Sequence, residues 1–167
     1  RYCVRGINVV TGTQNDTTDK HDRWIADDEW RTIVANVPLV SVDLVIEHDG
    51  GVVLGKRQNE PAKGEWFVPG GTVLKNESRT DAVHRVANDE LGEAVDIDDC
   101  LGTYEHLYET ADVDGVDSKH YLATGYRCHF TRDDPDIVSD EQHSDFQVFH
   151  PPFENLHPYV EQYLNDR

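Results

Sequence analysis

The sequence predicts one mixed α/β domain in which a mixed sheet lies between helices, and three observations support this. At 167 residues the chain is long enough for one well-buried core. Segments that alternate apolar and polar residues, as strands do, are interspersed with segments of helical spacing. They do not follow the regular βαβ order of a parallel sheet. We expect a partly loose N-terminal extension over residues 1–26 and a single domain over residues 27–167.

The first predicted elements are a helix and two strands. Apolar residues fall at helical spacing over residues 28–37, and Pro38 closes this helix. Residues 40–46 alternate apolar and polar side chains and predict a strand. A turn signal at residues 48–51 precedes the apolar residues 52–54, which indicates that a second strand follows in a hairpin.

A short strand and a well-marked helix are predicted next. The strand at residues 66–69 leads into the glycine pair at residues 70–71. Ser78 and Asp81 resemble a capping box at the start of the helix, with aspartate in place of the usual glutamate or glutamine. Gly92 is suited to end this helix, because glycine readily adopts the left-handed conformation.

The second half of the chain is predicted to supply the rest of the sheet and one more helix. An acidic loop at residues 111–118 separates two of the strands, and residues 131–144 are too polar and irregular for a strand. The expected elements are strands at 102–110, 119–130 and 145–150, and a final helix that begins at Pro152 or Phe153.

The charge of the chain excludes one class of partner. With 15 Lys and Arg against 33 Asp and Glu, the net charge is −18. Such a surface repels phosphate backbones, so we expect no nucleic-acid partner. An acid-rich, lysine-poor surface suits high salt, where screening relieves self-repulsion, and it indicates a halophilic source. An ordinary acidic protein is the alternative.

Cysteine usage and hydropathy favour a cytoplasmic protein. The three cysteines, Cys3, Cys100 and Cys128, have neither metal-like spacing nor an even count for a disulfide framework. No apolar run approaches membrane-spanning length, and the N-terminus lacks the layout of a signal peptide. We therefore expect no membrane partner.

The segment from Gly71 to Gly92 carries the chemistry. Glycines at residues 70–71 let the backbone approach a ligand closely. Arg85 and Asp89 lie four apart on the predicted helix and can pair. Glu77 can reach Arg85 or a metal, and Glu90 can supply an oxygen ligand to Mg²⁺. The alternative interpretation is an ordinary amphipathic helix with a solvated acidic end.

This segment resembles the Nudix signature, a glycine-to-glycine run built around Arg-Glu-x-x-Glu-Glu-x-Gly. The resemblance implies a Nudix-type α/β/α sandwich with a mixed sheet between helices. Two positions depart from the signature, because Val86 and Asp89 stand where it has glutamate. Val86 removes a metal ligand, so the literal signature would predict a weak or inactive enzyme.

The flanking sequence resembles a Nudix subfamily, the GDP-mannose mannosyl hydrolases, which lack the glutamate after the signature arginine. The resemblance covers about residues 30–150. It is carried by residues 38–43, 54–57, 61–71, 120–121, 125–127 and 140–143. It implies a hydrolase of a nucleotide sugar in which water attacks the anomeric carbon and releases GDP and the inverted hexose. It also implies a homodimer.

The resemblance further implies a metal site and a base. The Gly70 carbonyl, Glu90 and Gln142 would hold one Mg²⁺, or Mn²⁺ in its place. His143 would be the general base for the water, a task that suits imidazole because it titrates near neutrality. Without the matching run around it, His143 would be interpreted as a surface residue.

Five more residues match the subfamily's site. Arg57, Glu77 and Arg85 would belong to the catalytic machinery, with Arg57 stabilising charge on the leaving group. Asp43, Tyr121 and Arg57 would contact the nucleotide and diphosphate. Three of them also have a structural interpretation: Asp43 would break the apolar face of a strand or face water, Tyr121 would be a sheet aromatic, and Arg57 a surface arginine.

One departure leaves the substrate open. Thr72 stands where the subfamily has an arginine that assists the diphosphate, so Lys75 or another cation compensates, turnover is slower, or the substrate differs. The sequence fixes neither base nor sugar. Two alternatives remain: an ordinary Nudix pyrophosphohydrolase that cleaves a nucleoside diphosphate derivative at phosphorus, and a catalytically inert binding module, which Val86 and Thr72 favour.

Overall fold

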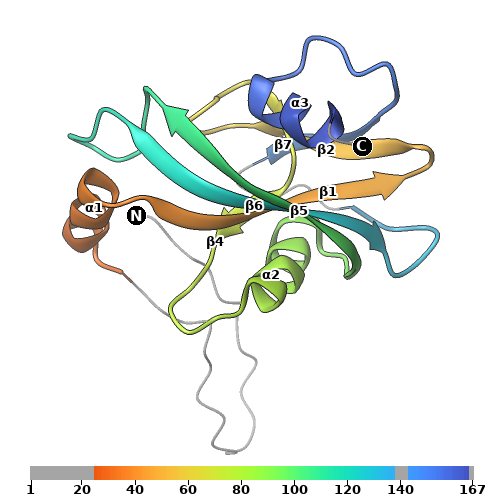
Figure 1. Cartoon of the computed structure of the whole chain (residues 1–167), viewed down its shortest axis with the longest axis horizontal. Helices are drawn as coiled ribbons and strands as arrows, with labels where there is room; N and C mark the ends of the chain where they lie inside the picture. The colour runs from red at the N-terminus through yellow and green to blue at the C-terminus, as the bar shows by residue number, and fades with distance from the viewer. Residues whose placement is uncertain (1–24, 138–142, 166–167) are drawn as a thin grey trace, which may run out of the picture.

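A computed structural model describes residues 25–137 and 143–165 as a curved sheet with helices around it (Figure 1). Its elements in chain order are α1 Asp27–Asn36, β1 Leu39–His48, β2 Gly51–Arg57, β3 Trp66–Phe67, β4 Gly70–Thr72, α2 Arg79–Leu91, β5 Val95–Tyr108, β6 Lys119–Phe130, β7 His143–Phe149 and α3 Pro158–Asn165. Within these described residues, no helix has the length and apolar character needed to cross a bilayer.

The sheet is mixed, as the sequence predicts. Five of its seven strands follow the order β3-β2-β1-β6-β5, while β4 pairs with β1 and β7 pairs with β2. The central pair β1–β6 is parallel, and the other pairs are antiparallel. The parallel pair brings residues 39–47 beside residues 121–129. Strand β1 thus lies between β4 and β6 and pairs with both of them.

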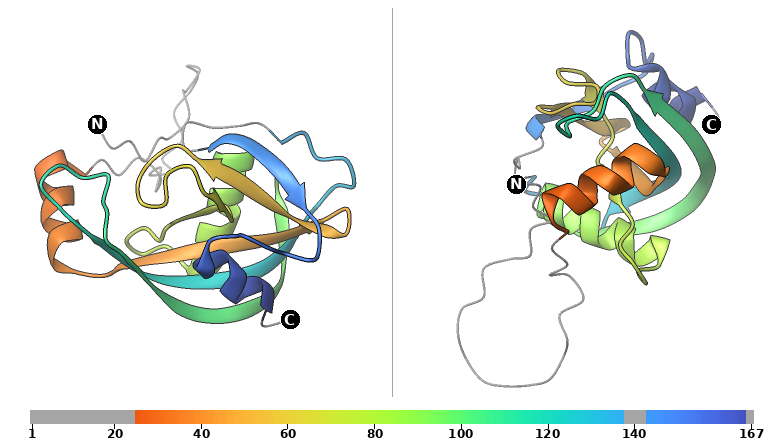
Figure 2. Two further views of the ribbon diagram at one scale, coloured as in Figure 1. Left: turned by 90° about the horizontal axis from the view of Figure 1, so that it is seen from above. Right: turned by 90° about the vertical axis from the view of Figure 1, so that its left-hand side faces the viewer.

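Alternation along β1 divides the core between two layers. Val42, Leu44 and Ile46 belong to the cluster that packs against α2, whereas Val45 belongs to the cluster that contains Val160 of α3. All five side chains are fully buried. The two helices accordingly lie on opposite sides of the sheet, while α1 lies at one end of it (Figure 2). This is the α/β/α arrangement that the sequence predicts.

Helix α2 begins and ends where its capping residues predict. The Ser78 hydroxyl oxygen accepts a hydrogen bond from the Asp81 N–H at 3.1 Å. At the other end Gly92 is left-handed, with φ 70°, and its N–H donates to the Asn88 carbonyl at 3.1 Å. The helix that carries the predicted carboxylates is thus fixed at both ends by local signals.

Strand β5 is longer than predicted, because it begins at Val95 rather than near residue 102. The Val95 side chain is buried in the core, while Asp96 and Asp98 are exposed to solvent. The alternation of Val95 and Ile97 with Asp96 and Asp98 lasts only four residues before Asp99 breaks it, and pairing with β6 continues the strand past this break. A register shift before Gly102, whose φ of 115° is left-handed, separates the two parts of β5.

Helix α3 also begins later than predicted, at Pro158 instead of Pro152 or Phe153. Asn155 has a left-handed φ of 60°, which interrupts any helix through that position. Proline is well suited to the first helical turn, and the His157 Nδ1 accepts a hydrogen bond from the Tyr159 N–H at 3.2 Å. Sequence periodicity alone does not mark this interruption.

Candidate active site

The glycine pair meets the acidic end of α2 beside β1. Gly70 is the register partner of Asp43 in the β1–β4 pair. The Glu90 side chain reaches the same glycine, and its Oε2 accepts a hydrogen bond from the Gly70 N–H at 3.2 Å. Glu90 is only 4% exposed. Gly70 and Glu90, which the sequence predicts as metal ligands, therefore lie in direct contact.

Val86 occupies the interior side of α2. It is 2% exposed and belongs to the core cluster against β1. A Cβ atom added at Gly71 would lie 2.8 Å from the Val86 Cγ2, so glycine is required for this close approach of strand and helix. The residue that replaces a signature glutamate is therefore a packing residue, and a carboxylate there would point into the core.

Glu77 and Arg85 hold the glycine loop. The Arg85 Nε donates to Glu77 Oε1 at 2.7 Å, and its Nη2 donates to Glu77 Oε2 at 3.0 Å and to the Thr72 carbonyl at 2.9 Å. Asp89 lies 3.7 Å from the same guanidinium. Burial alone would lower the pKa of Arg85, but the bonds to Glu77 raise it. The Leu74 N–H also donates to Glu77, at 2.8 Å, which closes the loop.

Asp43 is a buried carboxylate on the opposite face of β1 from α2. Burial raises its pKa to about 6, against the opposing effects of a hydrogen bond from Tyr163 and the positive charge of Arg57. A Cβ atom at Gly70 would lie 2.5 Å from Asp43 Oδ1, so the carboxylate packs directly on the glycine backbone. Asp43 and Glu90 thus contact Gly70 from two elements.

Strand pairing brings Arg57 beside His143. In the β2–β7 ladder the two residues are register partners. The Arg57 Nε donates to the Pro61 carbonyl at 2.8 Å, and its guanidinium lies 5.7 Å from the centre of the Phe67 ring. Gln142, the third predicted metal ligand, falls outside the described residues.

Tyr121 lies on the Asp43 face of the sheet but further along it. In β6 it is four residues before Gly125, the register partner of Asp43. Its ring is 6.1 Å from that of Tyr108, and the Lys119 ammonium lies 5.7 Å from the Tyr121 ring. Tyr121 also packs in the small cluster that holds α1 against the sheet. Tyr121 is therefore displaced from Asp43 along the sheet, toward α1.

A cluster of aromatic and histidine side chains lies between β5 and α3 and was not predicted from the sequence. The His106 ring stacks on Tyr159 at 4.2 Å with an angle of 8° between the planes. Burial, together with a smaller effect of the neighbouring His157, lowers the pKa of His106 to about 4. A signal was present: Tyr104, His106 and Tyr108 alternate in β5, and Tyr159 and Tyr163 lie four apart in α3.

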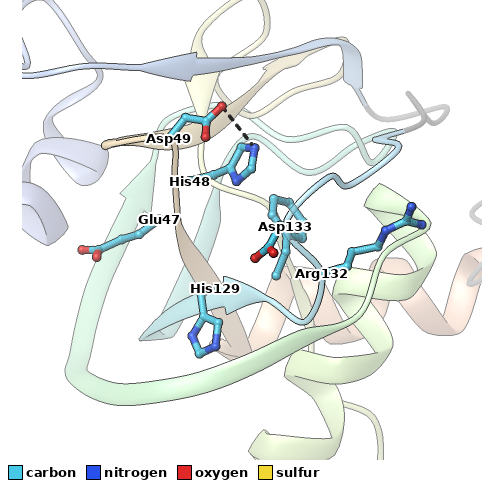
Figure 3. Close-up of a pocket in the computed structure, with 7 residues that line it drawn as sticks. Glu47, His48, Asp49, His129, Arg132 and Asp133 are labelled. Atoms are coloured by element: carbon cyan, nitrogen blue, oxygen red, sulfur yellow. Dashed lines mark ion pairs between the residues drawn. The ribbon is translucent and has the colours of Figure 1, made fainter.

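A cavity of about 310 Å³ lies elsewhere, at the turn between β1 and β2 (Figure 3). His48 and Asp49 line it with an ion pair of 3.5 Å. The other lining residues are Glu47, His129, Phe130, Arg132 and Asp133. It shares no residue with the predicted site in the part of the chain that the structure describes. The predicted site instead lies around Gly70, where the carboxylates of Asp43 and Glu90 are buried.

The fold of this chain is shared with a known protein family. The family described as NUDIX domain matches residues 37–163, which is most of the chain. The chain belongs to the Nudix family. Helix α2 carries the Nudix signature. The fold is shared with the MutT NUDIX hydrolase from Burkholderia pseudomallei, whose crystal structure superposes with a TM-score of 0.64. The two chains are 28% identical, and the superposition covers 78% of this chain and 98% of that one.

Two of the relatives that match this chain in sequence differ in how much of it they cover. The chain is 62% identical over 152 residues to the "Low-salt glycan biosynthesis protein Agl8" of Haloferax volcanii, covering 91% of this chain and 96% of the relative. It is 40% identical over 67 residues to an "ADP-ribose pyrophosphatase" of Methanocaldococcus jannaschii, covering 40% of each chain. The chain is accordingly a Nudix hydrolase, a member of a family that generally uses divalent metal ions.

Proposed function

We propose that this Nudix hydrolase acts on a nucleotide sugar, GDP-mannose or GDP-glucose, and releases GDP and hexose through attack of water at the anomeric carbon. The proposal rests on the β2–β7 pairing, in which Arg57 is the register partner of His143. A base and a leaving-group cation from neighbouring strands suit displacement of a diphosphate. The name of the 62% identical relative, a glycan biosynthesis protein, supports a sugar-containing substrate.

The residues around Gly70 fit Mg²⁺ as the cofactor. A buried carboxylate, Glu90, contacts the glycine backbone, and both supply oxygen, the ligand type that a hard cation takes. With Gln142 they would form a partial site, completed by water and substrate phosphate. Mn²⁺ accepts the same ligands. Bound Mg²⁺ would act as a Lewis acid that stabilises the departing diphosphate.

Each protein residue has one task in this proposal. His143 takes the proton from water, and Arg57 opposes the charge that develops on the leaving group. Asp43 and Tyr121 hold the nucleotide diphosphate. Glu77 and Arg85 hold the glycine loop, and thereby Gly70, in place. Val86 lies in the core, which leaves Glu90 as the carboxylate of α2 that contacts Gly70. A base from a distant strand compensates for the missing glutamate.

The position of bond cleavage tests the proposal. Turnover of GDP-mannose, GDP-glucose and ADP-ribose is measured with Mg²⁺ at high salt in ¹⁸O-labelled water. Label in the hexose supports attack at carbon, and label in a phosphate product refutes it. His143→Ala is expected to lose at least about 100-fold in kcat, the usual contribution of a general base.

An ordinary pyrophosphohydrolase is the second candidate. The ADP-ribose pyrophosphatase relative favours it, although the matching segment spans only 40% of each chain. This alternative predicts ¹⁸O in a phosphate product and little loss of activity in His143→Ala. An absence of turnover across the panel would instead favour the inert binding module.

We also propose the setting in which the enzyme works. The charge of −18 supports a cytoplasm of high salt, which agrees with a relative from Haloferax volcanii. We propose a homodimer, with residues 27–167 as one domain and residues 1–26 as an extension. Sedimentation at high and low salt tests the homodimer, which predicts twice the mass of one chain.

A further inference from the structure

Helix α3 reaches the candidate site through one buried hydrogen bond. The Tyr163 hydroxyl donates to Asp43 Oδ2 at 2.8 Å, joining residues that are 120 positions apart in the sequence. Tyr163 is 1% exposed and Asp43 is 7% exposed, so water does not compete with this bond. The other oxygen, Oδ1, packs on Gly70. The carboxylate is therefore held between the glycine loop and α3.

The Tyr163 ring packs closely against a glycine of the sheet. Gly125 in β6 is the register partner of Asp43. A Cβ atom at Gly125 would lie 2.7 Å from the Tyr163 Cε1, so any larger residue would displace the ring. The Tyr104 ring packs edge-on against Tyr163 with a distance of 4.9 Å between ring centres. Packing on two sides thus fixes where the hydroxyl points.

The hydroxyl has one further polar neighbour. The His106 Nε2 lies 3.4 Å from it. Because the single hydroxyl proton is donated to Asp43, the hydroxyl oxygen is the acceptor toward His106. The stack of His106 on Tyr159 ties this histidine to α3 as well. Two residues of α3 therefore support the orientation of Asp43, one directly and one through His106.

We propose that Tyr163 is a positioning residue, whose hydroxyl fixes the Asp43 carboxylate in the orientation that accepts a hydrogen bond from a donor group of the nucleotide. This inference rests on the substrate contact proposed for Asp43, and it makes α3 a part of the nucleotide site. Without the hydroxyl, the carboxylate can rotate about its terminal torsion and loses the geometry in which it meets a ligand. Tyr163 itself does not touch the substrate.

GDP binding tests this role without requiring turnover. The affinity for GDP is measured by calorimetry with Mg²⁺ at high salt, for the wild type, Tyr163→Phe, Asp43→Asn and the double variant. Tyr163→Phe keeps the ring and removes only the hydroxyl, and we expect it to weaken GDP binding about five- to twentyfold. The double variant is expected to bind no more weakly than Asp43→Asn, because Tyr163 acts through Asp43.

Tyr104→Phe is the matched control. It removes a hydroxyl that donates to the Leu101 carbonyl at 3.1 Å, in the same cluster but away from Asp43. We expect its GDP affinity to stay within about twofold of the wild type. Gly125→Ala, which moves the Tyr163 ring but keeps its hydroxyl, is a second variant and should weaken GDP binding as Tyr163→Phe does.

The outcomes separate this inference from the proposed function. GDP affinity unchanged in Tyr163→Phe but lowered in Asp43→Asn overturns the role of Tyr163 alone. Losses that multiply in the double variant also overturn it, because they indicate an independent structural effect. An unchanged affinity in Asp43→Asn overturns both the Asp43 contact and the inference. The position of the ¹⁸O label decides the site of water attack independently of all these values.

Discussion

Restoring the signature glutamate at Val86 is expected to damage the protein instead of adding a metal ligand. Val86 is 2% exposed and packs on Gly71. Val86→Glu loses about 2 kcal/mol of apolar burial. A glutamate in a core has its pKa raised to about 8, so at about pH 7 it is protonated at a cost of about 4 kcal/mol. The sum of about 6 kcal/mol is comparable to the whole stability of many domains.

The pH dependence of the stability of Val86→Glu distinguishes the effect of the glutamate charge from the effect of its shape. The folded form of Val86→Glu binds its proton more tightly than the unfolded form, so stability falls as pH rises above the ordinary glutamate pKa of about 4.3 and levels off above the folded pKa. Urea unfolding, followed by tryptophan fluorescence at high salt, is compared at about pH 5 and about pH 8. Val86→Gln, with the same shape and no charge, should lose stability by an amount that does not depend on pH.

Two results would refute this reasoning. The first is a Val86→Glu protein as stable as the wild type at the higher pH, which would place the side chain in solvent. The second is a larger stabilisation by Mg²⁺ in Val86→Glu than in the wild type. That result would mean that the helix can present another metal ligand, since a ligand that binds the folded state stabilises by mass action.

Three further outcomes are expected. The pKa of Asp43 is raised from 3.8 to about 6, so the folded protein binds this proton more tightly than the unfolded chain does. The stability of the wild type relative to Asp43→Asn should therefore fall by up to about 3 kcal/mol between about pH 4 and about pH 6, as measured by thermal unfolding. A difference in stability that does not change with pH would contradict the raised pKa. Glu93 is buried, accepts a hydrogen bond from the Asp136 N–H at 2.6 Å and lies 3.6 Å from the exposed Arg132. Glu93→Ala should therefore cost about 1–3 kcal/mol in urea unfolding, against less than about 1 kcal/mol for Arg132→Ala, which removes only an exposed ion pair. Equal losses would contradict this. Mg²⁺ should raise the unfolding temperature of the wild type but not of Glu90→Gln, by calorimetry; equal shifts would exclude Glu90 as a ligand.

The elements that sequence predicts best are those with strong local signals. Helix α2 has a serine cap and a glycine terminator, and both form the expected hydrogen bonds. Strand β6 has its predicted bounds, residues 119–130. The first part of β5 and the start of α3 depend on contacts with other elements instead. In β5 the alternation lasts only four residues before Asp99 breaks it, and the left-handed Asn155 carries no periodic signal.

The candidate site divides in the same way. The glycine loop, Glu77, Arg85 and Glu90 are local to one motif, and the structure brings them together. The contact of Tyr163 with Asp43 could not be derived from spacing, because it joins a helix and a strand 120 positions apart and depends on the close approach of the Tyr163 ring to Gly125 of β6. Period-two and helical spacing indicate which face each aromatic residue occupies, but not which partner it meets.

The parallel pairing of β1 with β6 has a consequence for how the chain folds. Leu39 lies beside Tyr121, so the central ladder closes a loop of about 80 residues, with an entropic cost that must be met before the ladder forms. The β5–β6 hairpin, by contrast, is local in sequence. We expect folding to be limited by this long-range closure and to be slow for a domain of this size. The strand that holds Asp43 then acquires its neighbours late, so the nucleotide site is assembled only as the chain reaches its native topology.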